Sequence, residues 1–139
     1  MKSFVLDASV TLAWLIDKST APYAAHVRQL LLRGSRALVP ALWQWEVANG
    51  FVSAERRGVL TSSDTAEILQ AFEKAIGHVI EIRSESASIQ RVVATARESR
   101  LTAYDAAYLA LAREQQLPIA TLDRSLAKAA REVGVALLH

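Results

Sequence analysis

Short apolar runs alternate along this chain with longer segments of mixed apolar and polar residues. The short runs are typical of buried parallel strands, and the longer segments are typical of helices packed on a sheet. The predicted strands are Phe4–Leu6, Ala37–Pro40, Val79–Ile82, Leu117–Thr121 and Val135–Leu138. This alternation predicts an α/β/α sandwich with a central, mainly parallel sheet of about five strands.

The predicted helices fill the intervals between these strands. They are expected at Val10–Ile16, from Pro22 to Gly34, at Leu42–Arg57, from Asp64 to about Gly77, at Ser86–Ser99, at Ala103–Gln115 and at Arg124–Val133. Pro22 suits the first turn of a helix, and Gly58 closes the third one. Asp64 and Glu67 are expected to form a capping box for the fourth helix. Because no linker, repeat or low-complexity segment divides the chain, one domain over residues 1–139 is predicted.

Composition excludes several classes of protein. With 139 residues, of which 52% are hydrophobic, the chain can bury a core and is not expected to be disordered. It has no cysteine, which excludes disulfides and thiolate metal sites and fits a reducing cytoplasm. No apolar stretch approaches the ~20 residues that span a bilayer, and Asp7 interrupts the apolar start. Neither a membrane protein nor a signal peptide is therefore expected.

The distribution of charge is more informative than the net charge of +2. Without the acids at positions 7, 46, 105 and 123, 10 acids remain against 16 bases, so the rest of the molecule carries +6. Twelve of the 16 bases are arginine, the side chain suited to bidentate phosphate contacts. A phosphate-binding surface and an ordinary solvated arginine-rich surface both account for this distribution.

Four carboxylates begin predicted helices or lie early in them. Asp7 and Asp123 follow predicted strands, whereas Glu46 and Asp105 lie near the starts of predicted helices. The carboxyl ends of parallel strands meet at one edge of a sheet, where ligands collect. Acids delivered to that edge from separate segments would form a cluster that a hard cation could neutralise. The pattern therefore indicates a metal-dependent phosphodiester enzyme.

Each acid taken singly also has a purely structural explanation. Asp7 and Asp123 could be N-caps that accept hydrogen bonds from free helix amides. Asp105 follows Thr102 by three residues, so this pair could be a capping box. Glu46 could be an ordinary exposed helix residue. On these explanations none of the four does chemistry.

The surroundings of the acids favour the catalytic interpretation. Residues 102–112 are apolar almost all round and predict a buried helix, on which an ionised aspartate is costly unless it is paired or metal-bound. Ser9 and Thr121 could hydrogen-bond the carboxylates and fix their rotamers. Asn49 lies three residues after Glu46 on the same helix face, as a neutral ligand or an orienting group.

The four local sequences, in this order, are similar to those of a known family. They are Asp7-Ala8-Ser9 after a strand, Glu46-Val47-x-Asn49, Thr102-Ala103-Tyr104-Asp105-Ala106 and Thr121-Leu122-Asp123. Together they resemble the PIN-domain nucleases, most closely the short VapC-type toxins of toxin–antitoxin pairs, over essentially the whole chain. The resemblance implies a Mg²⁺- or Mn²⁺-dependent endoribonuclease with Asp7, Asp105 and Asp123 as the main metal ligands. It implies that Glu46 is a further ligand, or the group that orients or deprotonates the water.

The resemblance also implies partners. An RNA substrate, a small cognate antitoxin, a homodimer and a place in the cytoplasm are expected. The antitoxin would lay an apolar helix in a groove and send an arginine into the acidic site. The chain itself has a surplus of large apolar residues for one small core: Trp14, Leu15, Trp43, Trp45, Phe51 and Phe72. Either some of these six form an interface, or all six belong to the core.

Several other residues allow more than one interpretation. Arg56 and Arg57 could grip RNA, but they also lie in the last turn of a predicted helix, where cations suit the helix dipole. The tryptophans could stack on bases, although tryptophans at helical spacing more often pack in a core or interface. Asp17-Lys18 stands where many of these toxins carry acids, so a fifth acidic contribution does not follow. The three histidines lack the spacing of metal ligands.

Two further functions fit the same sequence. A non-catalytic PIN-like module would use its acids only to bind RNA or a partner's arginines. An RNA-processing nuclease with no toxin role would share the chemistry and differ only in biological context. The presence of acids at all four positions favours an enzyme over the binding module.

Overall fold

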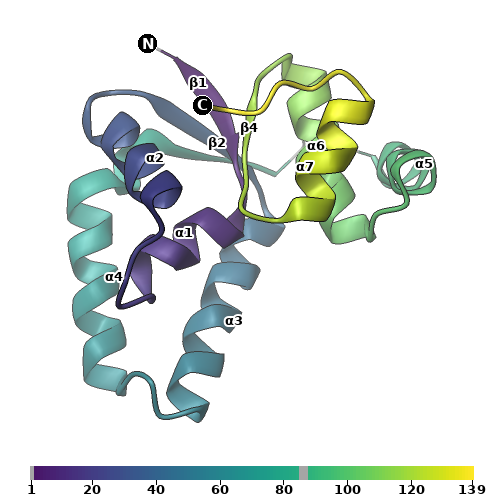
Figure 1. Ribbon diagram of the computed structural model, residues 1–139. Helices are drawn as coiled ribbons and strands as arrows, with labels where there is room; N and C mark the ends of the chain where they lie inside the picture. Colours follow the sequence, from purple (N-terminus) through teal and green to yellow (C-terminus); the bar gives the residue numbers. More distant parts are fainter. Residues whose placement is uncertain (1, 85–87) are drawn as a thin grey trace.

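A parallel sheet of four strands forms the centre of the structure, a computed structural model that describes residues 2–84 and 88–139. The strands are Ser3–Leu6 (β1), Arg36–Pro40 (β2), Ile80–Arg83 (β3) and Ile119–Ala120 (β4), in the spatial order β3-β2-β1-β4. Every pairing between neighbours is parallel. The carboxyl ends of all four strands therefore open on one edge of the sheet (Figure 1).

The fifth predicted strand, Val135–Leu138, does not form, and the prediction is wrong on this point. Only an isolated bridge joins Leu137 to Ile119. Two backbone hydrogen bonds join this segment to Ile119 in β4, from the Ile119 amide to the Ala136 carbonyl and from the Leu138 amide to the Ile119 carbonyl, each of 2.9 Å. The segment is apolar because it packs against the edge of the sheet. An apolar sequence pattern indicates burial, but it does not indicate how many backbone hydrogen bonds the segment makes to a neighbouring strand.

Helices cover both faces of this sheet, as predicted. They are Ala8–Leu15 (α1), Pro22–Leu32 (α2), Leu42–Arg56 (α3), Ser62–Ile76 (α4), Ile89–Ser99 (α5), Ala103–Gln115 (α6) and Arg124–Glu132 (α7), with a 3-10 turn (η1) at Gly77–Val79. In Figure 1, α1, α2 and α4 gather on one side of the sheet and α5, α6 and α7 on the other. The predicted start at Ser86 lies outside the described residues. None of the helices in the described ranges is long and apolar enough to cross a bilayer.

The N-terminus of α4 differs from the prediction. Thr61 is the N-cap: its Oγ1 accepts a hydrogen bond of 3.0 Å from the Asp64 amide. Asp64 Oδ2 in turn accepts one of 2.9 Å from the Thr61 amide, and these bonds lower the pKa of Asp64. The predicted box between Asp64 and Glu67 is therefore wrong by three residues, because Thr61 supplies the hydroxyl one turn earlier.

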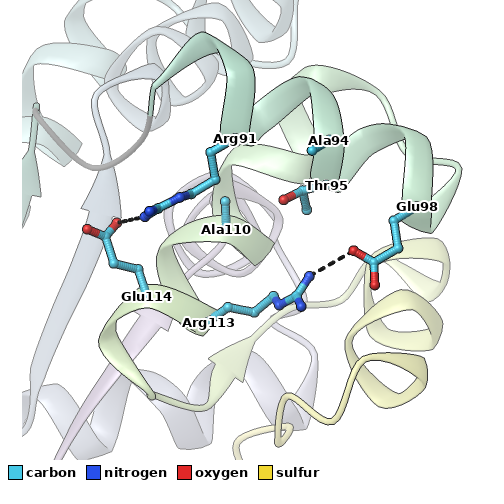
Figure 2. Close-up of a pocket in the computed structure, with 7 residues that line it drawn as sticks. All are labelled: Arg91, Ala94, Thr95, Glu98, Ala110, Arg113 and Glu114. Carbon is cyan, nitrogen blue, oxygen red and sulfur yellow. Dashed lines mark hydrogen bonds and ion pairs between the residues drawn. The ribbon is translucent and has the colours of Figure 1, made fainter.

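Two ion pairs fasten α5 to α6 at the surface. Arg91 Nη1 lies 3.4 Å from Glu114 Oε2, and Arg113 Nη1 lies 3.0 Å from Glu98 Oε2. The two pairs flank a hollow of about 470 Å³, which Figure 2 shows. Small side chains from both helices line the rest of it: Ala94, Thr95 and Ala110. Its charged groups are paired with one another, so this hollow offers no chemistry of its own.

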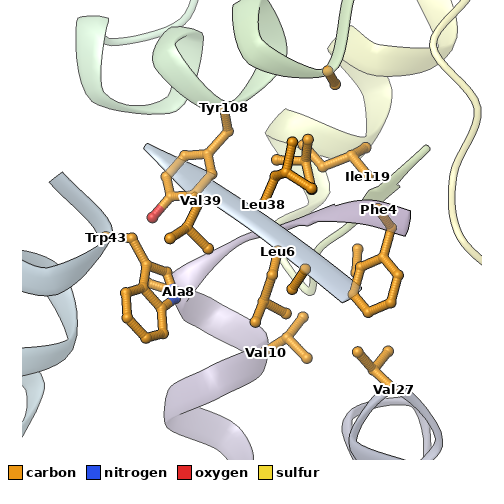
Figure 3. Close-up of a cluster of buried hydrophobic side chains, with 14 of the residues drawn as sticks. Phe4, Leu6, Ala8, Val10, Val27, Leu38, Val39, Trp43, Tyr108 and Ile119 are labelled. Carbon is orange, nitrogen blue, oxygen red and sulfur yellow. The ribbon is translucent and has the colours of Figure 1, made fainter. Parts of the chain in front are cut away.

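The core fills the space between the sheet and both helical layers. Figure 3 shows Leu6 and Val10 on one side of β2 and Tyr108 on the other, all fully buried. Trp43 also belongs to the core, where its Nε1 donates a 3.1 Å hydrogen bond to Thr11 Oγ1 and so ties α3 to α1.

The six large apolar residues of the predicted surplus differ in how deeply they are buried. Trp14, Trp43 and Phe51 are buried, and Leu15 and Phe72 are partly buried against the core. Trp45 is different, because it is 73% exposed. The interpretation that all six are core therefore fails at this one residue.

Candidate active site

All four predicted acids line one open cleft of about 410 Å³. Asp7 follows β1, Glu46 lies in the second turn of α3, Asp105 lies in the first turn of α6, and Asp123 immediately precedes α7. α1 and α3 form one side of this region, and the first turns of α6 and α7 form the other (Figure 1). The parallel topology thus brings together four side chains that are far apart in the sequence.

Asp7 is the most deeply buried of the four, at 5% exposed. Its Oδ2 accepts hydrogen bonds from Ser9 Oγ at 2.6 Å and from Thr121 Oγ1 at 2.8 Å. Burial raises the pKa of the Asp7 carboxyl, the two hydroxyls oppose that rise, and the Asp123 carboxylate adds to it. The residue occupies the N-cap position of α1, but its side chain makes no capping bond. The capping explanation therefore fails for Asp7.

Ser9 and Thr121 connect Asp7 to the loop that carries Asp123. Ser9 Oγ accepts a 3.0 Å hydrogen bond from the Leu122 amide, and Thr121 Oγ1 accepts one of 3.0 Å from the Asp123 amide. Each hydroxyl thus donates to the carboxylate and accepts from the loop. Both residues lie where the sequence predicted them, and together they fix the first acid relative to the fourth.

Asp123 does cap a helix. Its Oδ1 accepts hydrogen bonds from the amides of Ser125 at 2.8 Å and Leu126 at 3.1 Å, at the start of α7. Both bonds use the same carboxylate oxygen, and the residue also lines the cleft. Capping and membership of the acidic site are compatible here, because the cap holds the carboxylate in place.

Glu46 is held by a residue that the sequence did not single out. The Tyr108 hydroxyl donates a 2.6 Å hydrogen bond to Glu46 Oε1 and so joins α6 to α3. Burial and this bond raise the pKa of Tyr108 far above its ordinary value, so the phenol stays a donor. Burial also raises the pKa of Glu46, against the effect of Tyr108 and with additions from Asp7 and Asp105. The sequence spacing could have identified Tyr108 as a residue of the site, because it follows Asp105 by three residues and so lies on the same face of the helix.

Asp105 forms only half of a capping box. Its amide donates a 3.2 Å hydrogen bond to Thr102 Oγ1, which makes Thr102 the N-cap of α6, but its carboxylate returns no bond to the Thr102 amide. Burial raises the pKa of Asp105, the carboxylates of Asp123 and Asp7 raise it further, and the Thr102 side chain opposes the rise. Thr102 thus caps the helix without using the carboxylate, which remains at the cleft.

The side of the cleft that α1 and α3 form depends on close contact between these two helices. A Cβ added to Gly50 would meet Leu12 Cδ2 and lie 2.9 Å from Leu12 Cδ1, and both residues line the cleft. Asn49 lines it as well, as predicted, and it is exposed. Arg57 donates from Nε to the Ser53 carbonyl at 3.4 Å, which supports the interpretation that this cation suits the end of α3.

The donor set of the cleft fits a hard divalent cation. Its polar lining offers oxygen from the four carboxylates, from Ser9 and Ser53 and from the Asn49 amide. Mutual repulsion contributes to the raised pKa values of Asp7, Glu46 and Asp105, and a cation would relieve it. Within the described ranges, no three Asp, Glu or His side chains are yet close enough to form a ready-made metal site. The four acids therefore line the same cleft, but no three of them are close enough to contact one ion at the same time.

Two sequence comparisons show which known proteins this chain is similar to. The family model described as PIN domain matches residues 4–132. The chain is 34% identical over 127 residues to ribonuclease VapC3 of Pyrobaculum aerophilum, a match that covers 89% of this chain and 92% of that protein.

Solved structures share the same fold. PAE2754 from Pyrobaculum aerophilum superposes with a TM-score of 0.70 at 22% identity, over 92% of this chain and 84% of that one. FitAcB from Neisseria gonorrhoeae gives 0.62 at 20% identity, over 98% and 96%. FitAB bound to an IR36 DNA fragment gives 0.56 at 18% identity, over 97% and 93%. At these identities the likeness concerns the fold alone.

Proposed function

This chain belongs to the PIN-domain family, and from that premise we propose that it is a metal-dependent endoribonuclease and the toxin of a toxin–antitoxin pair. The observation that carries the proposal is the convergence of four carboxylates in one cleft. Its relative of 34% identity bears the name ribonuclease, which supports RNA as the substrate. The place of action that we propose is the cytoplasm, where such a substrate is found.

In the proposed mechanism, Asp7, Asp105 and Asp123 hold Mg²⁺ or Mn²⁺. When bound, such an ion would lower the pKa of water and offset the negative charge that develops on the oxygens of the phosphate group. Ser9 and Thr121 hold the Asp7 carboxylate in one orientation through its Oδ2. Preorganisation of this kind lowers the cost of gathering like charges around an ion.

Glu46 is the proposed group that orients or deprotonates the attacking water. Its raised pKa brings it nearer to neutral pH, where a general base is most effective. Tyr108 fixes one of its oxygens, Oε1, so the carboxylate faces the cleft in a defined orientation. Asn49, at the same face of α3, is an additional orienting group.

Cleavage of a panel of structured RNAs by the purified protein tests this function. We expect internal cleavage in Mg²⁺ or Mn²⁺, no cleavage after chelation, and recovery when the ion is returned. Binding of RNA without cleavage under any of these conditions would instead support a non-catalytic module. A small reading frame beside the gene would separate a toxin from an RNA-processing nuclease.

A small antitoxin and a second copy of the chain complete the proposal. An apolar groove of about 310 Å³ lies between α1, α2 and α4, and an amphipathic helix is the natural occupant of such a groove. Three residues of the predicted surplus line it: Trp14, Leu15 and Phe72. An arginine from that partner would pair with the acids of the cleft. Light scattering of the protein, alone and co-expressed with its neighbouring gene, tests both partners, and a strict monomer without a bound small protein would exclude them.

A further inference from the structure

Three of the four acids in the cleft directly follow an exposed apolar side chain. Trp45 precedes Glu46 and is 73% exposed, and Tyr104 precedes Asp105 and is 67% exposed. Leu122, which precedes Asp123, is 39% exposed. The other two tryptophans of the chain, by contrast, are buried. Scattered apolar residues are ordinary on a protein surface, but packing does not explain why these lie beside the acids.

The two aromatic residues lie on the helices at opposite sides of the cleft, next to its lining residues Glu46 and Asp105. The 2.6 Å hydrogen bond from Tyr108 to Glu46 joins α6 to α3. Trp45 is adjacent to Glu46 on α3, and Tyr104 lies one helical turn before Tyr108 on α6. Residues four apart on a helix are neighbours at roughly 6 Å. Trp45 and Tyr104 therefore each lie within about one helical turn of the hydrogen bond between Tyr108 and Glu46.

The face of α3 that carries Trp45 also carries polar and basic side chains that suit nucleic-acid binding. Asn49, four residues after Trp45, lines the cleft. Arg56 is eleven residues after Trp45, which places it on the same helix face at a distance of roughly 16 Å. Arg56 is exposed, and in the described part of the chain it enters no ion pair with an acidic side chain. An aromatic ring, an amide and an unneutralised cation thus follow one another away from the acids.

We propose that Trp45 and Tyr104 are stacking contacts for unpaired bases of the RNA strand whose phosphate lies in the acidic cleft. The inference rests on the proposed ribonuclease function and names the contacts that position its substrate. Aromatic rings bind bases without strong sequence preference, because every base has a π-face. Bases inside a duplex are not free to stack on a protein, so the strand is unpaired where it crosses the cleft.

A protein partner is the competing occupant of this surface. Val52, seven residues after Trp45 and 42% exposed, is the one large apolar side chain between Trp45 and Arg56 on this face of α3. The neighbouring cleft-lining residues Asn49, Gly50 and Ser53 are polar or small, so the face offers an apolar helix little to bury. The apolar groove that does suit a helix lies elsewhere, between α1, α2 and α4. The observations therefore favour RNA at Trp45, and the response of Trp45 to single-stranded RNA distinguishes the two occupants.

Tryptophan fluorescence gives a direct signal, because Trp45 alone of the three tryptophans is exposed. The probe is a short single-stranded RNA of mixed sequence, compared with the duplex that it forms with its complement. The protein carries Asp105→Asn to prevent cleavage. We expect the single strand to quench the fluorescence and the duplex to leave it nearly unchanged. Trp45→Phe in the same background should retain binding and lose the quenching.

Affinity measurements with matched variants complete the test. Trp45→Leu keeps an apolar side chain but removes the aromatic face, and should weaken single-strand binding roughly 5- to 100-fold, as should Tyr104→Ala. Ile89→Ala is the control, because Ile89 is 85% exposed on α5 and lies outside the cleft, and it should change nothing.

The proposal is overturned if Trp45→Leu and Tyr104→Ala, both folded by circular dichroism, bind the single strand as tightly as their parent. It is also overturned if the duplex quenches equally, or if these variants weaken self-association in light scattering and leave RNA binding intact. Unchanged binding by these variants, together with metal-dependent cleavage by the wild-type protein, would exclude the stacking contacts and leave the nuclease assignment intact. Stacking signals without any metal-dependent cleavage would support the contacts and refute the nuclease.

Discussion

At the scale of single residues, Asp7 shows why an acidic site costs stability before it binds an ion. Burial raises the pKa of this carboxyl above its ordinary value of 3.8, so the folded protein binds the proton more tightly than the unfolded chain does. The stabilisation from this proton is complete below pH 3.8 and is lost as the pH rises through the higher, folded pKa.

The first prediction concerns Asp7→Asn in metal-free protein. Because asparagine cannot ionise, the variant should match or exceed the wild-type melting temperature at neutral pH, and its advantage should disappear in acid. Urea denaturation over a pH series measures this difference. Asp64→Asn is a matched control of opposite sign, because hydrogen bonds lower the pKa of Asp64. The stabilisation from its ionised form is complete above its ordinary pKa and is lost as the pH falls through the lowered, folded pKa. A wild-type protein that outperforms Asp7→Asn increasingly at higher pH would contradict the account.

The second prediction concerns Tyr108→Phe, which removes the hydroxyl that binds Glu46 Oε1. Loss of an orienting hydrogen bond beside an active site should lower kcat roughly 10- to 100-fold with a small effect on KM. Because this bond lowers the pKa of Glu46, its loss should also move the acidic limb of the rate profile to higher pH. An unchanged pH profile would show that Tyr108 is merely structural.

At the scale of elements, the N-termini of the helices were harder to predict from the sequence than the helices themselves. The positions of the helices followed from the apolar pattern, but the N-terminus of α4 did not. Thr61 and Asp64 are both good N-cap residues, and in the structure Thr61 is the N-cap while Asp64 returns the second bond of the capping box. The capping box expected at Thr102 is half formed, which leaves Asp105 at the cleft. Local sequence proposes such hydrogen bonds, and tertiary packing decides which of them form.

The third prediction concerns the end of α6. Gln116 is the C-cap and adopts a left-handed conformation, with φ of 54°, which costs energy for any residue with a Cβ. Gln116→Gly should therefore raise the free energy of unfolding by about 0.5–1 kcal/mol. Glu114→Gly, inside the same helix, should lower it by about 1 kcal/mol. Thermal denaturation compares the two, and destabilisation by both would refute the role of backbone strain.

At the scale of the whole molecule, topology made the acids predictable. Parallel strands place their carboxyl ends at one edge, so residues after β1 and β4 had to lie near each other. Tyr108 and Gly50 escaped prediction, because a phenol that reaches across to α3 and a close helix contact are properties of packing. The exposure of Trp45 escaped for the same reason, since its apolar neighbours in the sequence face the core.

The fourth prediction is that Mg²⁺ or Mn²⁺ stabilises the whole fold. An ion bound only by the folded state raises stability by mass action, by about 2.7 kcal/mol at an ion concentration near ~100 Kd. The gain should fade in acid, where protons compete for carboxyls whose pKa values are raised. Calorimetric titration and melting curves measure both effects, and calorimetry without any divalent binding at neutral pH would exclude the proposed site.

The most direct measurement is RNA cleavage in Mg²⁺ or Mn²⁺ by Asp105→Asn beside the wild type. Thr102 caps α6 without help from the Asp105 carboxylate, so the variant should fold and keep its circular dichroism spectrum. With one of the proposed metal ligands removed, its cleavage rate should fall by at least ~100-fold. A folded Asp105→Asn protein that cleaves RNA at the wild-type rate in the presence of the ion would contradict the account.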